Sequence, residues 1–250
     1  MHDLSLELSK SVPKDADVVI VGLATAGDAT SLVGGTSELD KAYTKAFNAN
    51  VSTLATAMQA SSALEKVTVL PQADGVRAVV VGLGEPDVAP ATLRRAVGAA
   101  ARAIIGLPDV EGLTVAVSLE LTDPELLQAA AEGAALGAYR VQKVTGQATP
   151  EPIAKIAVVG PSRLGDSLVD ARANIRGVYQ ARDWSNTPPN LLYPESFAEA
   201  AKAYVKDERI AVEVLDEKAL AKGGYGGILA VGGGSERTLS LIHISEPTRL

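Results

Sequence analysis

The chain has 250 residues, of which 47% are hydrophobic, so it can fill one large core or two modest ones. Its formal net charge of −7 gives no broad attraction to phosphate backbones, which argues against nucleic acid as a main partner. It has no cysteine, which excludes a disulfide framework, a thiolate zinc site and a cysteine nucleophile, and suits a reducing compartment.

The first ten residues are typical neither of a signal peptide nor of a membrane anchor. They hold His2, Asp3 and Glu7 among apolar residues, so the basic flank and the uninterrupted apolar core of a signal peptide are missing. No run in the chain approaches the roughly 18 apolar residues that a membrane span needs. We therefore expect a globular cytoplasmic protein that does not bind a membrane.

Short runs of β-branched and aliphatic residues predict buried strands. Their apolar character is continuous rather than alternating, as expected when helices cover both faces of a largely parallel sheet. The sequence therefore predicts an α/β layer fold. The predicted strands are Val18–Leu23, Val67–Leu70, Ala78–Val81, Leu113–Val117, Ile156–Val159 and Val212–Leu215.

Alanine-rich segments between these runs predict helices. Over residues 93–105 the apolar positions recur at intervals of three and four, and Pro90 stands where the first turn of a helix tolerates proline. Later helices are predicted over about residues 167–181, from Pro194 onward, and in a short segment capped by Asp216.

Another helix is predicted to begin at Thr122 or Asp123, because the four residues from Thr122 fit a capping box, and to run to about Arg140. Gly133 and Gly137 lie inside it. Each costs up to about 1 kcal/mol of helix stability relative to alanine, unless close packing uses the missing side chain.

Two segments have the composition of connections. Residues 144–152 are rich in Thr, Gly, Gln and Pro, as expected of an exposed loop. Residues 183–194 contain three prolines and two asparagines and follow a predicted helix. Because prolines stiffen the backbone and remove amide donors, this helix and loop are predicted to connect two domains.

Two glycine clusters follow predicted strands and are candidates for anion-binding turns. Gly82, Gly84 and Glu85 lie between a strand and a helix, where a phosphate-binding turn would form, but Asp87 stands where a third glycine belongs. Residues 232–235, Gly-Gly-Gly-Ser, could present amides to an anion, but no Gly-Lys-Ser/Thr follows. An ordinary turn is favoured for both.

The residues suited to catalysis do not form a recognisable set. Ser162 lacks the Gly-x-Ser-x-Gly spacing, and the two histidines, His2 and His243, both lie near the chain ends. The acidic pairs 207–208 and 216–217 are better explained as solvated helix ends than as metal ligands. No catalytic, cofactor-binding or metal-binding residue is assigned in this chain.

Four segments in order nevertheless resemble one family. Residues 181–190, ARDWSNTPPN, resemble the interdomain signature of the leucyl aminopeptidases, the cytosol aminopeptidases of the M17 metallopeptidase family. The family order continues in 194–198, PESFA, and in 212–234, VEVLDEKALAKGGYGGILAVGGG, and is preceded by 132–140, EGAALGAYR. The sequence departs from the family at Trp184 and Ser185, where small or aliphatic residues are more usual, which leaves local packing in question.

The resemblance implies a three-layer αβα domain similar to macro domains over residues 1–160 and a connecting helix and loop over 161–185. It also implies a truncated start of the C-terminal catalytic α/β domain over 186–237. From Thr238 to Leu250 the sequence resembles a translated sequencing adapter, so this tail is expected to be non-native; a divergent natural tail is the alternative.

In this family two divalent ions, Mn or Zn, activate a water that attacks the first peptide bond of a peptide substrate. The metal ligands lie in segments resembling Gly-Lys-Gly-x-x-Phe-Asp-Ser-Gly-Gly and Asn-Thr-Asp-Ala-Glu-Gly-Arg, and neither occurs in this sequence. We therefore expect this chain to be an inactive part of a leucyl aminopeptidase, with no metal bound by the chain itself.

Two functions of other classes stay open. The N-terminal part, similar to macro domains, is a candidate binding module for ADP-ribose or a related nucleotide. Alternatively, the chain has a non-catalytic role in oligomer assembly, since the family forms hexamers.

Overall fold

The computed structural model describes residues 4–108, 110–141, 151–206, 210 and 212–234. The chain divides between Asp183 and Trp184 into two compact units, which are considered separately. Unit 1 precedes this division and contains a sheet with its helices, whereas the described part of unit 2 is helical. None of the described helices combines the length and the apolar character needed to cross a bilayer.

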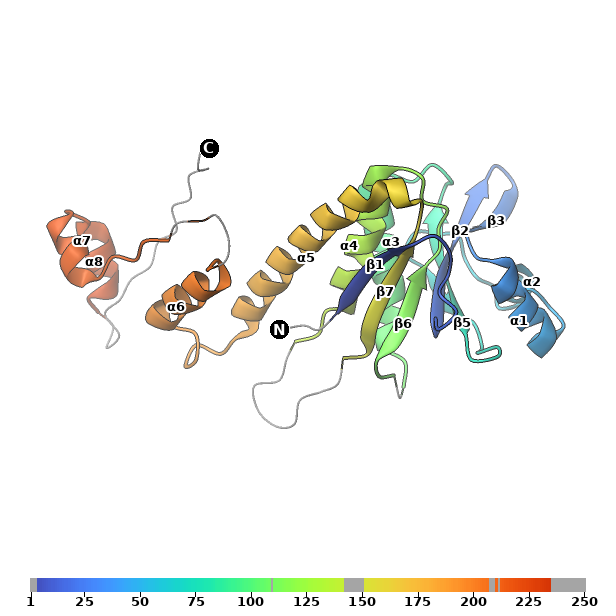
Figure 1. The fold of residues 1–250 in the computed structure, drawn as a ribbon, viewed down its shortest axis with the longest axis horizontal. Coiled ribbons are helices and arrows are strands. Elements are labelled where there is room, and N and C mark those ends of the chain that lie inside the picture. The colour runs from blue at the N-terminus through green and yellow to red at the C-terminus, as the bar shows by residue number, and fades with distance from the viewer. Residues whose placement is uncertain (1–3, 109, 142–150, 207–209, 211, 235–250) are drawn as a thin grey trace. The chain divides into compact units, whose positions relative to one another are not determined.

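Unit 1 is built on a seven-stranded sheet in the order β1-β7-β6-β2-β5-β4, with β3 paired to β2 (Figure 1). Strands β1, β7, β6, β2 and β5 pair in parallel, whereas β3 and β4 pair antiparallel to β2 and β5. The largely parallel sheet predicted from the sequence is confirmed. The strands are β1 Ser5–Ser9, β2 Val18–Ala26, β3 Ala29–Val33, β4 Val67–Val69, β5 Arg77–Gly84, β6 Leu113–Val117 and β7 Ile153–Val159.

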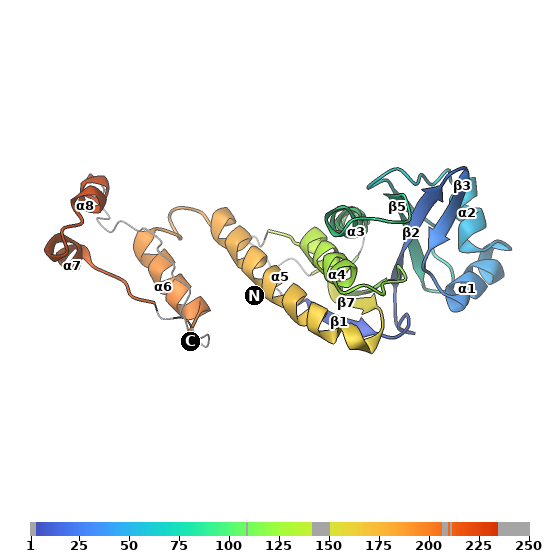
Figure 2. The same cartoon turned by 90° about the horizontal axis from the view of Figure 1, so that it is seen from above.

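Helices cover both faces of this sheet, because successive side chains of a strand point to opposite sides. In β2, Val18 and Ile20 belong to one hydrophobic core, with residues of α3, α4 and α5, while Val19 and Val21 belong to a second core with α1 and α2. Figure 2 shows the two helical layers on either side of the sheet. The helices are α1 Ser37–Phe47, α2 Val51–Ala57, α3 Pro90–Ile105, α4 Pro124–Ala138 and α5 Gly165–Asn186.

Five of the six predicted strands lie in β2, β4, β5, β6 and β7, and the sixth prediction is wrong. Residues 212–215 form no strand among the described residues, and Val212 is 40% exposed. The glycine cluster that begins at Gly232 was expected to follow a strand. It follows a helix instead, because α8 spans Gly226–Gly232. Strands β1 and β3 and helices α1 and α2 were not predicted, since their apolar residues are few and widely spaced.

The predicted helices are confirmed, with shifts at their ends. Helix α4 is capped by Asp123 rather than Thr122, because Asp123 Oδ1 accepts hydrogen bonds from the amides of Glu125 and Leu126 at 2.9 and 3.1 Å. Helix α5 continues to Asn186, so the loop that follows begins later than predicted. The loop expected over residues 144–152 falls mostly outside the described residues.

Unit 2 contains α6, Pro194–Tyr204, α7, Glu217–Lys222, and α8 in its described part. Asp216 caps α7 as predicted, since its Oδ1 accepts from the amide of Ala219 at 2.8 Å. The unusual Trp184 packs edge to face with Phe197 at 4.9 Å and Tyr204 at 5.8 Å between ring centroids. An aromatic cluster of this kind contributes about 0.5–1.5 kcal/mol per pair beyond burial.

Helices α3 and α4 approach closely because glycines line their contact. A Cβ atom added at Gly133 would lie 2.4 Å from the carbonyl oxygen of Arg94, and one added at Gly137 would lie 2.5 Å from that of Gly98. The two glycines inside the predicted helix are therefore used for backbone contact, the one condition under which their cost in helix stability is offset.

We predict that Gly133→Ala destabilises the chain by about 1–3 kcal/mol, because its methyl group forces α3 and α4 apart. Gly177→Ala in α5 is the matched control, since nothing lies within 4 Å of its added Cβ and alanine favours a helix by up to about 1 kcal/mol. Urea unfolding of both variants measures the difference. Equal stability of the two variants would contradict the close packing of α3 on α4.

Candidate functional site

A cleft of about 620 Å³ lies where several parallel strands end. It is lined by residues at or just after the ends of β1, β6 and β7 and by residues of the loop after β3. In open α/β sheets ligands bind beyond the carboxyl ends of the strands, where the strand order changes direction, and here the chain passes from β5 to β6 across β2. The lining residues are Lys10, Ser11, Gly35, Thr36, Ser118, Glu120, Leu121, Thr122, Val159, Gly160, Pro161 and Ser162.

The floor of this cleft is held by contacts between two loops. A Cβ atom at Gly34, whose φ is +86°, would lie 1.8 Å from the carbonyl oxygen of Ser118, so only glycine fits there. The amide of Gly35 donates to Ser118 Oγ at 3.2 Å, and that hydroxyl donates to the carbonyl oxygen of Gly35 at 3.4 Å. Ser118 is 4% exposed, so the loop after β3 is joined to the loop after β6.

The lining is nearly uncharged, and more of its surface is apolar than polar. Lys10 and Glu120 are its charged side chains and largely balance one another, while Ser11, Thr122 and Ser162 offer hydroxyl groups. Such a surface can hydrogen-bond a neutral or weakly anionic small molecule. The described lining contains no histidine or cysteine.

Gly82 and Gly84, which the sequence offers as candidates for a phosphate-binding turn, do not form one. Both lie within β5 rather than after it. The amide of Gly82 donates to the carbonyl oxygen of Lys66 at 2.8 Å, and that of Gly84 to Ser62 at 2.7 Å. Their amides are therefore committed to the backbone. Gly82 is required for another reason, since its added Cβ would lie 2.0 Å from the carbonyl oxygen of Ala63.

Ser162 begins the short 3-10 helix η1, Ser162–Leu164, and reaches the cleft. In the sequence, Ser162 is considered only as a hydrolase nucleophile, and its spacing from the neighbouring glycines argues against that role. His2, His243, Ser235 and the acidic pair at 207–208 lie outside the described residues. Asp216 is a helix cap, as the sequence predicts for the pair at 216–217.

The described residues do not fit a two-metal centre. They contain no group of three or more His, Cys, Asp or Glu side chains close enough to hold an ion. The most buried carboxylate, Glu132, is surrounded by hydrogen-bond donors rather than by other ligands. We therefore derive no metal-dependent step from this part of the chain.

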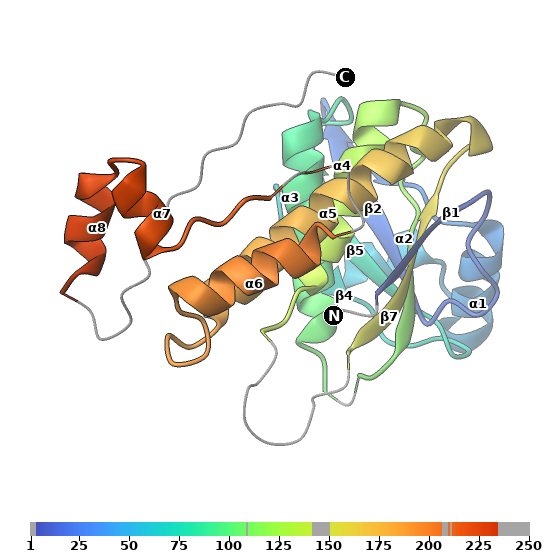
Figure 3. The ribbon, with the colours of Figure 1, turned by 60° about the vertical axis from the view of Figure 1, so that its left-hand side comes forward.

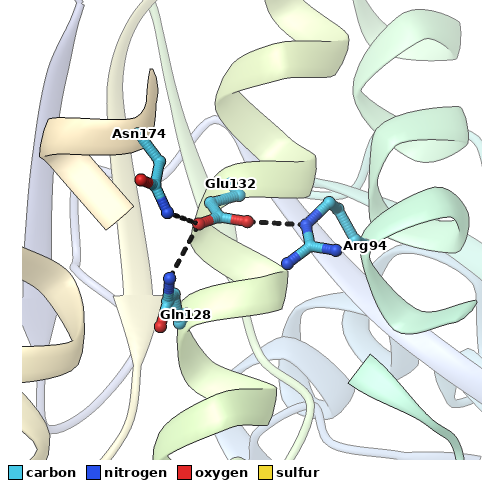
Figure 4. Close-up of polar contacts among 4 residues, drawn as sticks. All are labelled: Arg94, Gln128, Glu132 and Asn174. Atoms are coloured by element: carbon cyan, nitrogen blue, oxygen red, sulfur yellow. Dashed lines mark hydrogen bonds and ion pairs between the residues drawn. The ribbon is translucent and has the colours of Figure 1, made fainter. Parts of the chain in front are cut away.

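Glu132 is the centre of a polar cluster that joins three helices (Figure 4). Its carboxylate accepts hydrogen bonds from Arg94 Nε of α3 at 2.6 Å, Gln128 Nε2 of α4 at 2.9 Å and Asn174 Nδ2 of α5 at 2.8 Å. The Glu132 side chain is 5% exposed, whereas that of Arg94 is 39% exposed. The sequence signal for this cluster is a single carboxylate within the alanine-rich residues 129–135.

The environment of Glu132 favours its charged form. Burial alone would raise the pKa, but hydrogen bonds from Asn174, Gln128 and Arg94 and the positive charge of Arg94 outweigh it, so the pKa lies below its usual 4.5. The carboxylate is therefore ionised at neutral pH, as a partner for Arg94 rather than as an acid catalyst.

A largely parallel sheet between two helical layers, with a long helix leading to a second unit, defines a two-unit α/β protein. Comparison with known protein families identifies the family of this chain. The N-terminal domain of the cytosol aminopeptidase family matches residues 20–146, and the catalytic domain of the same family matches residues 179–247. The second match extends into the tail that resembles an adapter. The chain belongs to the cytosol aminopeptidase family.

Relatives and solved structures agree with this assignment. Probable cytosol aminopeptidases of Cutibacterium acnes and Streptomyces griseus are each 37% identical, over 92% and 98% of this chain but 45% and 51% of their own length. The chain thus spans about half the length of these relatives. A tomato leucine aminopeptidase mutant has the same fold, with a TM-score of 0.72 at 20% identity over 94% of this chain and 49% of its own. The bottromycin maturation enzyme BotP gives 0.64 at 28% identity over 89% and 44%.

We predict that Glu132→Gln lowers the free energy of unfolding at pH 7 by about 1–3 kcal/mol, because the hydrogen bonds to a charged acceptor are weakened. Since the pKa of Glu132 is lowered by folding, its contribution is present above about pH 4.5 and is lost as the pH falls through the lower folded value. The difference between wild type and Glu132→Gln should therefore shrink on acidification.

Urea unfolding at pH 7, 5 and 3.5 measures this difference. Glu125→Gln is the control, because Glu125 lies on the same helix but is exposed. A gap between Glu132→Gln and wild type that stayed constant with pH would show that the ionised carboxylate is not the stabilising form.

Proposed function

We propose that this chain forms the N-terminal domain and the beginning of the catalytic domain of a metal-dependent leucyl aminopeptidase. The supporting observation is the order of the two family matches along one chain, over residues 20–146 and 179–247. In this proposal residues 1–160 form the N-terminal domain, 161–185 the connection and 186–237 the start of the catalytic domain. The last 13 residues, 238–250, are non-native.

The complete enzyme would remove N-terminal residues from peptides in the cytoplasm, consistent with the name of its relatives. Two divalent ions, Mn or Zn, would be held by the remainder of the catalytic domain and would activate the attacking water. The three-layer domain resembling macro domains would serve assembly of a homo-oligomer, a hexamer in the family.

A second candidate function is supported by the cleft at the carboxyl ends of the strands. Its volume of about 620 Å³ is within the range of small-molecule sites, and its floor is held by the contact of Ser118 with Gly34 and Gly35. Hydroxyl groups from Ser11, Thr122 and Ser162 suit a sugar or nucleotide. ADP-ribose, which carries both groups, is the ligand with which binding to this cleft is tested.

We predict that the purified 250-residue chain releases no leucine from leucine p-nitroanilide with or without added Mn²⁺ or Zn²⁺. The reason is that neither of the two ligand-bearing segments of the family occurs in its sequence. Metal-dependent release that a chelator abolishes would overturn the inactivity.

A fresh read of the source DNA beyond the codon for Arg237 tests the other half of the proposal, since the two missing segments should follow in frame.

If the cleft binds a nucleotide, ADP-ribose at millimolar concentration should raise the melting temperature of the chain by a few degrees, because a ligand that binds only the folded state stabilises it. Ser162→Trp would occlude the cleft from an exposed position and should abolish the rise. Asp170→Trp, exposed on α5 and absent from the lining, is the control. An unchanged melting temperature with wild-type protein would exclude this ligand.

A further inference from the structure

The long helix α5 passes from unit 1 into unit 2, since it runs from Gly165 to Asn186 and the units divide after Asp183. Its apolar side chains Leu168, Ile175 and Tyr179 are part of the core of unit 1. Figure 3 shows α5 lying beside α4. Tyr179 is the last buried apolar side chain of α5 within unit 1, and polar contacts follow it.

Those interactions begin at the end of α4. A helix leaves its last four carbonyl groups without partners inside the helix, and α4 ends at Ala138. The hydroxyl of Tyr179 donates to the carbonyl oxygen of Ala135, and Arg182 Nη1 donates to that of Leu136 at 2.9 Å. Burial raises the pKa of Tyr179, so its hydroxyl stays protonated and remains a donor. Two residues of α5 therefore satisfy carbonyl groups at the end of α4.

Tyr139, directly after α4, completes the arrangement. Its ring packs edge to face on Tyr179 with centroids 5.2 Å apart, and the guanidinium carbon of Arg182 lies 5.1 Å from the centroid of the Tyr139 ring. The Tyr139 hydroxyl donates to Asp183 Oδ1 at 3.0 Å. These contacts reach the last residue of unit 1.

The middle of α5 is held separately. Asn174 donates to the buried Glu132 carboxylate at 2.8 Å, and Arg172 Nη2 donates to the carbonyl oxygen of Leu6 in β1. The helix is thus attached to unit 1 near its centre and again at the unit boundary. Two points of attachment along one rod restrict its direction, whereas a single point would leave it free to pivot.

We propose that Tyr139 and the end of α4 form a clamp that holds α5 in one direction as far as Asp183. The clamp consists of Tyr139, Tyr179, Arg182 and Asp183 with the carbonyl groups of Ala135 and Leu136. Unit 1 then acts as a fixed support for the interdomain helix. This role is independent of the proposed peptidase activity and of nucleotide binding in the cleft.

The absence of cysteine allows a direct test in the whole 250-residue chain. Lys41→Cys on the exposed side of α1 and Ala181→Cys, exposed on the part of α5 that belongs to unit 1, provide two sites for nitroxide labels. The distance distribution between them is measured by double electron–electron resonance. With the clamp intact we expect one narrow distance. In Tyr179→Phe combined with Arg182→Ala we expect the distribution to broaden at least twofold.

Gln180→Ala is the matched control, because Gln180 belongs to the same turn of α5 but not to the clamp, and it should leave the distribution narrow. Arg182→Lys keeps one donor and should give an intermediate width. A thermal melt checks that unit 1 stays folded in each variant; if the double variant does not, Arg182→Ala alone is compared with Gln180→Ala. Equal widths in clamp and control variants would overturn the proposal.

Discussion

The burial of one carboxylate imposes the main constraint on the helical layer of unit 1. A charge that is removed from water must be given donors, and Glu132 takes them from Arg94 of α3, Gln128 of α4 and Asn174 of α5. Because each donor belongs to a different part of the layer, the three helices can satisfy the charge in one register only. A shift of α3 or of α5 along α4 would remove the donor that the shifted helix supplies.

Glycine and alanine make that register possible. The contact at Gly133 and Gly137 brings α4 near the backbone of α3, so that short side chains fill the space and Arg94 can reach across. Beneath this layer the alternating side chains of β2 separate two cores, one under α3, α4 and α5 and one under α1 and α2. The helix that leads to unit 2 therefore rests on the larger of the two cores.

The matches that assign the chain to the cytosol aminopeptidase family cover residues 20–146 and 179–247, and they do not depend on catalytic residues identified in the described part. Unit 1 supplies a sheet, a cleft and a supported helix, but the described residues hold no cluster of metal ligands.

The sequence by itself determined the elements whose signal is local. Continuous apolar runs marked the central strands, helical spacing marked α3, and the capping-box pattern over Thr122–Glu125 marked the start of α4 to within one residue. It failed at Val212–Leu215, because a strand exists only with a partner, and at β1, because an edge strand needs little apolar character. Tertiary structure alone decided why Gly82 and Gly133 are glycines, why Glu132 is tolerated in an apolar helix, and that Tyr179 and Arg182 meet the end of α4. Each of these depends on an atom more than 15 residues away in the chain, and no local pattern of residues records such a distance.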